Sequence, residues 1–192
     1  EPRARPVGCE IDEREAAAAP RVAHFLVDAA VHEALENLTR AWPEKAEIVN
    51  GEIVRMSPTG DMPARAAFKI AMSLTQMERK LGGRAYPDNV GYKVDLPNRK
   101  SFSPDASFYI GQPTGMKFLD GAPVFAVEVR SEGDYGPQGE AALAQKRRDY
   151  FAAGTLVVWD VDLLSRDVVR VYRSATPDTP KAYRRGDIAE AE

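Results

Sequence analysis

The stretch PVFAVEVR, at residues 123–130, has the pattern of a strand that lies inside a sheet. Side chains alternate between the two faces of a strand, so one face is apolar throughout, with Phe125, Val127 and Val129. On the other face the carboxylate of Glu128 interrupts the apolar run, two residues before Arg130. A buried carboxylate needs a cation, hydrogen-bond donors or a metal ion as its partner. Glu128 is therefore either a metal-binding acid or the partner of Arg130 or another arginine.

A second acid, Asp105, lies in the stretch FSPDASFYI at residues 102–110, where another predicted strand enters the core. An aspartate after Ser-Pro is also typical of a turn. The loop between the two predicted strands contains Gly and Pro, so neighbouring strands can bring Asp105 and Glu128 together. Two close carboxylates repel each other unless a divalent cation neutralises them. Oxygen ligands without a nearby Cys or His favour Mg²⁺ or Mn²⁺, and we predict such a site on these two acids.

The predicted site also needs a cationic member, for which the sequence offers Arg130 and Lys146. An arginine stays protonated and cannot act as a base. Lys146 lies three residues after Leu143 and four before Tyr150, so it shares the apolar stripe of a predicted helix. If Lys146 points inward, its ammonium can orient a water molecule or stabilise charge that develops on a phosphate. The alternative is a lysine at the margin of the stripe whose ammonium reaches water.

The remaining pattern predicts an α/β or α+β fold, with a mixed sheet flanked by helices. An N-terminal helix carries the apolar stripe Val31, Leu35, Leu38 and Trp42. Asn50-Gly51 favours a type I′ turn, which predicts a hairpin within residues 46–58. The later elements are a helix with the stripe Ile70, Leu74, Met77 and Leu81 that ends at Gly82-Gly83, strands at 84–96, 102–110 and 123–130, a helix at 137–153, and strands at 155–162 and 167–173. The strand at 155–162 is apolar enough to lie centrally.

Length and composition favour one ordinary globular domain in a chain of 192 residues, with 44% hydrophobic and 29% charged residues. We predict a flexible segment at 1–21 and a single domain at 22–192. The net charge of −3 gives no general basic field for nucleic acid. One cysteine excludes an internal disulfide, and His24 and His32 supply at most part of a soft-metal site. No apolar run is long enough to span a membrane, and we expect a cytoplasmic protein.

Five motifs in a fixed order give the chain a family resemblance over about residues 45–173. They are NGEIVRMSPTG at 50–60, SPDASF at 103–108, VFAVEVRS at 124–131, the spaced set Lys146, Tyr150 and Gly154, and VVWDVD at 157–162. This order resembles the bacterial Uma-two family of putative restriction endonucleases, in the PD-(D/E)XK nuclease superfamily. The resemblance implies a core of helix, three strands, helix and strand. It also implies Mg²⁺-dependent hydrolysis of phosphodiester bonds in DNA.

The resemblance also assigns residues to roles. Asp105 matches the aspartate of the superfamily and Glu128 its second acid, and these two would bind the metal. Arg130 stands where the superfamily has a lysine, and Lys146 is similar to the migrated lysine of such families. Two further acids of the hairpin match recurrent family acids, namely Glu47 and Glu52. Lys146 would position the attacking water, with Arg130 or Glu52 assisting.

The chain departs from the family pattern at two places. Asp61-Met62-Pro63 stands where the family often has a histidine, and SEGD at 131–134 stands where relatives usually have SPSD. A basic strip for the DNA backbone is expected from Lys146, Arg147, Arg148, Arg184 and Arg185, although such residues are as typical of a solvated helix face. Two copies are the simplest means to cut both strands, so we expect a homodimer. Two alternatives stay open: a weak or inactive binding or regulatory protein of this fold, and a structural or partner-binding protein whose buried acids are ion-paired.

Overall fold

The computed structural model describes residues 45–190. The predicted flexible segment and the predicted helix before Pro43 lie outside these residues. The described helices are α3 (Asp61–Thr75), α4 (Glu78–Leu81), the 3₁₀ helix η1 (Glu132–Asp134) and α5 (Pro137–Ala152). None of them is long and apolar enough to cross a membrane.

The strands of the described region form three sheets. The large sheet has the order β11-β10-β9-β8-β6-β3. Its members are β3 (Arg84–Pro87), β6 (Ala106–Tyr109), β8 (Phe125–Val129), β9 (Val157–Val161), β10 (Asp167–Arg173) and β11 (Thr176–Arg184). A hairpin joins β1 (Ala46–Val49) and β2 (Glu52–Arg55), and a small sheet contains β4 (Tyr92–Lys93), β5 (Ser101–Phe102) and β7 (Leu119–Asp120).

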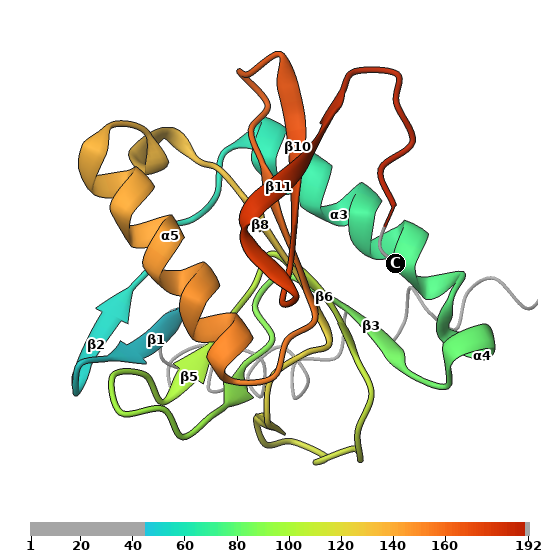
Figure 1. Cartoon of the computed structure of the whole chain (residues 1–192). Coiled ribbons are helices and arrows are strands. Elements are labelled where there is room, and N and C mark those ends of the chain that lie inside the picture. Colours follow the sequence, from blue (N-terminus) through green and yellow to red (C-terminus); the bar gives the residue numbers. More distant parts are fainter. Residues whose placement is uncertain (1–44, 191–192) are drawn as a thin grey trace, which may run out of the picture. The chain divides into compact units, whose positions relative to one another are not determined.

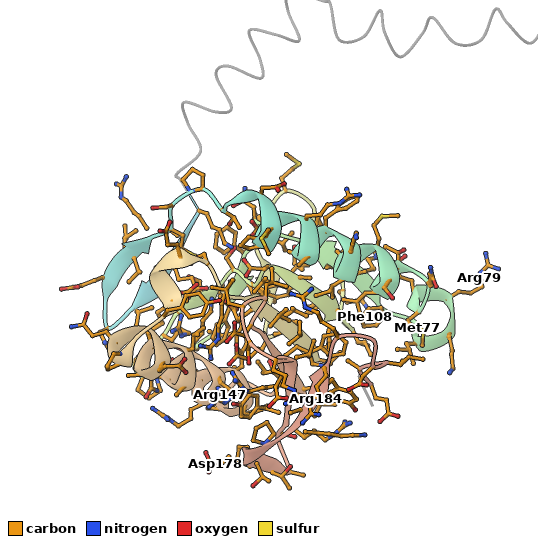
Figure 2. All side chains as sticks on the ribbon, turned by 90° about the horizontal axis from the view of Figure 1, so that it is seen from above. Met77, Arg79, Phe108, Arg147, Asp178 and Arg184 are labelled. Carbon is orange, nitrogen blue, oxygen red and sulfur yellow. The ribbon has the colours of Figure 1, made fainter. Side chains whose placement is uncertain are left out.

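The large sheet is mixed and lies between two helices, as the sequence predicted. The pair β8 and β9 at its centre is parallel, and its other pairs are antiparallel. Helix α3 covers one face and α5 the other (Figures 1 and 2). The predicted alternation along β8 is confirmed, because Phe125, Val127 and Val129 pack with α3 while Ala126 packs with Tyr150 of α5. Burial of one such valine side chain stabilises the fold by about 2 kcal/mol.

The hairpin and the end of the second helix are confirmed, but that helix is not continuous. Asn50 and Gly51 have φ angles of 53° and 79°, which a type I′ turn requires. The predicted helix breaks after Thr75, whose hydroxyl donates a 2.8 Å hydrogen bond to the carbonyl of Met72. Gly82, at φ 70°, ends α4 in the left-handed conformation. Leu81, expected in the buried stripe, is exposed.

Two predicted strands are each divided between sheets. The strand expected at 84–96 ends at Pro87, where the chain turns and enters the small sheet as β4. The strand expected at 102–110 is interrupted at residues 103–105, so β5 belongs to the small sheet and β6 to the large one. Strands β7 and β11 were not predicted. The long edge strand β11 is mostly exposed and contains two prolines, which sheets tolerate at an edge.

Candidate active site

Asp105 and Glu128 lie near each other at the central strands β6 and β8. The antiparallel register of this pair ends at Ala106 and Val127, and Asp105 is the residue directly before β6. The backbone N–H of Asp105 donates a 3.0 Å hydrogen bond to the carbonyl of Val127, which is one residue out of that register, so the ladder is irregular here. The Asp105 carboxylate accepts the backbone N–H of Val129 at 2.8 Å, and its negative charge acts on Glu128. The two predicted acids are therefore brought close together.

Glu128 has a protein partner on each carboxylate oxygen. The Tyr150 hydroxyl donates to Oε1 at 2.7 Å, and the Lys146 ammonium donates to Oε2 at 2.8 Å. The Glu128 side chain is only 14% exposed. Burial raises the pKa of Glu128 to about 7 against the attraction of Lys146, and the negative charges of Asp105 and Glu47 add to the rise. Burial is thus the main cause of the raised pKa of Glu128.

Lys146 points inward from α5 and lies between two acids. Its ammonium is 2.8 Å from Glu128 and 2.8 Å from Glu47, and its side chain is 13% exposed. Burial opposes the charge, yet the two carboxylates raise the pKa of Lys146, which stays a cation. Tyr150, one helical turn later, stacks on Phe102 with 4.0 Å between ring centroids and fixes this face of α5. The alternative of a lysine that reaches water is wrong for Lys146.

Glu47 connects the hairpin to the same group. It accepts the backbone N–H of Ser103 at 2.9 Å and also contacts the Arg99 guanidinium. Burial acts to raise the pKa of Glu47, but Lys146 and Arg99 lower it below its ordinary value. Arg99 in turn donates at 2.8 Å to Asp149 of α5. These buried ion pairs hold β1 and α5 together, and the pair of Lys146 with Glu47 adds a further contact between the two elements.

Asp105 is held on both oxygens. The backbone N–H of Val129 donates to Oδ2 at 2.8 Å, which explains why this acid stands where β6 begins. The Lys45 ammonium donates to Oδ1 at 2.9 Å and to Asp88 at 2.5 Å. The turn interpretation of Asp105 is partly correct, because the residue lies in the break between β5 and β6.

Arg130 does not join this group, contrary to the expectation that it assists there. Its Nε and Nη2 each donate at 2.7 Å to the carboxylate of Asp160 in β9, and its guanidinium also contacts Glu140 of α5. The Arg130 side chain is 3% exposed. The buried Asp160 and the exposed Glu140 thus fix Arg130 toward β9 and the first turn of α5.

Glu52 and the basic strip also differ from expectation. Glu52 pairs with Val49 across the hairpin, which places it on the face that carries Glu47, but it is exposed and no contact joins it to the site acids. Lys146 is absent from the strip because it is buried among acids. Figure 2 shows Arg147 and Arg184 on one side of the molecule, where they contact Tyr172 and Asp167.

Sequence reasoning missed the structural importance of Lys45, Arg99 and Tyr150. Tyr150 had a usable signal, since a residue four positions after Lys146 shares its helix face. Lys45 and Arg99 lie next to or between short strands and reach acids at least 43 positions away. No periodic pattern marks such contacts, and only the tertiary fold reveals them.

The two central acids suit a hard divalent cation. Among the described residues each of their four oxygens accepts one hydrogen bond, and a carboxylate oxygen has a second lone pair that can take a further ligand. Within residues 45–190 no three Asp, Glu, His or Cys side chains form a metal-binding group. Mg²⁺ is commonly held by one or two carboxylates, with water and substrate oxygens completing its shell. Asp105 and Glu128 therefore fit Mg²⁺ or Mn²⁺ and do not fit a closed structural zinc site.

The raised pKa of Glu128 predicts how stability depends on pH. In the folded protein this pKa is about 7, against an ordinary value of 4.5. Between pH 4.5 and pH 7 the folded state therefore binds more protons at Glu128 than the unfolded state does. The contribution of this protonation to stability is complete below pH 4.5 and is lost as the pH rises to about 7. From about pH 5 to about pH 8, in a chelator, we expect the wild type to lose stability relative to Glu128→Gln. Urea unfolding of both proteins measures this difference, and parallel pH profiles would contradict it.

Comparison with known proteins supports the same fold and family. The chain is similar to a solved structure described as a putative nuclease belonging to DUF820 from Anabaena variabilis ATCC 29413, with a TM-score of 0.58 and 18% identity. The similarity covers 79% of this chain and 85% of that one, and at this identity it supports the fold alone. No match was found among curated proteins. Residues 32–191 match the Uma2 family model, described as "Putative restriction endonuclease". The resemblance seen in the sequence motifs is thus confirmed, and the chain belongs to the Uma2 family of putative restriction endonucleases.

Proposed function

We propose that this protein is an Mg²⁺-dependent endonuclease that hydrolyses phosphodiester bonds of DNA at Asp105, Glu128 and Lys146. The observation that carries the proposal is the juxtaposition of the three groups. Two carboxylates lie near each other at the central strands β6 and β8, and a buried ammonium lies 2.8 Å from the second of them. A nuclease function also agrees with the family to which the chain belongs.

Each residue then has a role that follows from its contacts. Asp105 and Glu128 would hold the metal, which would lower the pKa of a bound water and stabilise charge on the phosphate. Lys146 stays protonated between Glu47 and Glu128, so it acts as a cation that orients water or phosphate oxygen and not as a base. Tyr150 donates to Glu128 and so orients its carboxylate. Glu47, held by Arg99, keeps the Lys146 ammonium in place.

The test combines metal binding with cleavage. We expect Mn²⁺ to bind the wild type in calorimetry, and expect Asp105→Ala to lose that binding because it removes one of two protein ligands. With Mg²⁺, plasmid cleavage should fall at least about a thousandfold in Asp105→Ala and Glu128→Ala. Asp95→Ala is the matched control, since Asp95 is a carboxylate that is 93% exposed and pairs only with Lys100 among the described contacts. Equal Mn²⁺ binding in wild type and Asp105→Ala, or full cleavage by Glu128→Ala, would reject the site.

One observation favours the alternative of a binding protein that has lost catalysis. The site acids already have cationic partners within the protein: Lys45 for Asp105, Lys146 for Glu128, and Lys146 with Arg99 for Glu47. Such a site could be stable without metal. If no Mn²⁺ binds the wild type while a DNA duplex still does, the binding protein is the better account.

DNA as substrate, a homodimer as the active form and a cytoplasmic location belong to the same proposal. DNA follows from the family, and a dimer from the need to cut two strands. Analytical ultracentrifugation with and without duplex DNA would test the dimer, and a monomer that cuts both strands would contradict it.

A further inference from the structure

Lys45 forms an ion pair with Asp105, one of the two acids of the proposed metal site. Its ammonium lies 2.9 Å from Oδ1 of Asp105 and 2.5 Å from Oδ1 of Asp88. The side chains of Lys45 and Asp105 are 15% and 14% exposed, so this contact is poorly screened by solvent. Burial opposes the charge of Lys45, but Asp105 and Asp88 raise its pKa above the ordinary value, so it remains a cation. A divalent cation at Asp105 would therefore meet a positive charge already in place.

Asp105 cannot easily turn away from Lys45. Its other oxygen, Oδ2, accepts the backbone N–H of Val129 at 2.8 Å, and rotation of the carboxylate would break that bond. The lysine is the movable member of the pair, because its four-carbon side chain has several rotatable bonds. Asp88 is an alternative partner for the Lys45 ammonium, which already contacts both Asp88 and Asp105. It is 40% exposed and is fixed by the Asn89 backbone N–H at 2.7 Å, where Asn89 turns the chain at φ 70°.

We infer that Lys45 is an internal counter-ion that competes with the metal for Asp105 and moves onto Asp88 when the metal binds. The inference rests on the proposed metal site but adds a determinant of its affinity. Lys45 neutralises Asp105 in the metal-free protein, so this acid is not left as an uncompensated charge. Asp88 holds the ammonium near the site after the exchange, where it can contact a substrate phosphate. The pair Lys45 and Asp88 thereby sets how tightly the divalent cation is held.

The inference predicts opposite effects for two substitutions, measured as Mn²⁺ affinity by calorimetry on the full chain. Lys45→Met removes the competing charge, and the loss of a charge-assisted contact should tighten Mn²⁺ binding by roughly tenfold. Asp88→Asn keeps an oxygen for the Asn89 N–H but removes the alternative partner of Lys45. It should therefore weaken Mn²⁺ binding severalfold. Asp88 is partly exposed, so this variant should fold even if Lys45→Met is destabilised.

A double variant separates the exchange from a general effect of charge. Removal of any nearby acid weakens cation binding slightly, but Asp88 acts through Lys45 only while Lys45 is present. Asp88→Asn should thus weaken Mn²⁺ binding much less in the Lys45→Met background than in the wild type. Lys100→Met and Asp95→Asn are matched controls. Lys100 and Asp95 form an exposed ion pair with 2.5 Å between Nζ and Oδ1, and no described contact joins this pair to Asp105 or Glu128. Both variants should leave Mn²⁺ affinity unchanged.

The outcomes distinguish this inference from the proposed function. If the wild type binds Mn²⁺ and Lys45→Met binds it equally or more weakly, the competition is disproved while the metal site stands. Equal effects of Asp88→Asn in both backgrounds would disprove the transfer to Asp88. If neither the wild type nor Lys45→Met binds Mn²⁺, the metal site itself is rejected and the inference with it. Mn²⁺ binding that appears only in Lys45→Met would support strong competition by the lysine.

Discussion

Replacement of Lys146 by methionine is expected to abolish cleavage and to lower the free energy of unfolding by about 3–5 kcal/mol. Methionine preserves most of the length and apolar character of the side chain, so the change removes mainly the ammonium. Glu47 and Glu128, both 14% exposed or less, would then face each other without their shared cation. One of them must take up a proton or the local structure must open. Urea unfolding and plasmid cleavage with Mg²⁺ measure the two effects.

Two controls separate the roles of Lys146 in stability and in catalysis. Lys100→Met removes an exposed, singly paired lysine and should change stability by less than about 1 kcal/mol. The double variant Lys146→Met with Glu128→Gln removes one of the stranded charges, so it should regain stability but not cleavage. Wild-type stability in Lys146→Met would mean that its two ion pairs have no net effect. Full cleavage by a folded Lys146→Met would exclude the catalytic role.

The sequence predicted the central sheet well because its signals are local and periodic. The apolar runs of β8 and β9 have strand length and need cover on both faces of the sheet. The structure places both strands at the centre of the large sheet, between two helices. Asn50-Gly51 specifies its own turn through the backbone angles that only a few residues adopt. Predictions failed where the chain changes sheets, at Pro87 and at Pro104. There a single extended run serves two sheets, and no side-chain period records the change.

The site was predicted in part for the same reason. Glu128 and Lys146 break apolar patterns, and a broken pattern is visible in sequence. The cations that pair with Asp105 and Glu47 are not visible, because Lys45 and Arg99 occur in polar surroundings where a charged residue is unremarkable. The choice between Lys146 and Arg130 also required the fold. In sequence, Arg130 shares a strand face with Glu128, and Lys146 shares the apolar stripe of its helix. Only the packing of α5 shows that Lys146 reaches Glu128 and that Arg130 reaches Asp160.

Arg130→Met is expected to lower the free energy of unfolding by about 3–5 kcal/mol while leaving Mn²⁺ affinity almost unchanged. Arg130 has two donors on Asp160, a carboxylate that is 5% exposed, and its removal leaves that charge buried without a cation. Asp105 and Glu128 do not contact Arg130 in the described structure, so their metal affinity should not depend on it. Urea unfolding and Mn²⁺ calorimetry test the two halves. A variant that unfolds as the wild type does, or loses Mn²⁺ binding while folded, would contradict this assignment.

Arg130→Lys asks whether the position two residues after Glu128 can still take the catalytic cation. A lysine there keeps the charge but loses the planar pair of donors to Asp160, so stability should fall, though less than in Arg130→Met. Because Asp160 and Glu140 attract the new ammonium, the double variant Lys146→Met with Arg130→Lys should remain inactive in plasmid cleavage. Restored cleavage would show that the ammonium can reach Glu128 from either position. Continued inactivity in a folded double variant would mean that Asp160 and Glu140 hold the side chain at position 130 away from Glu128. The residue at position 130 then has a structural role, and Lys146 alone supplies the catalytic cation.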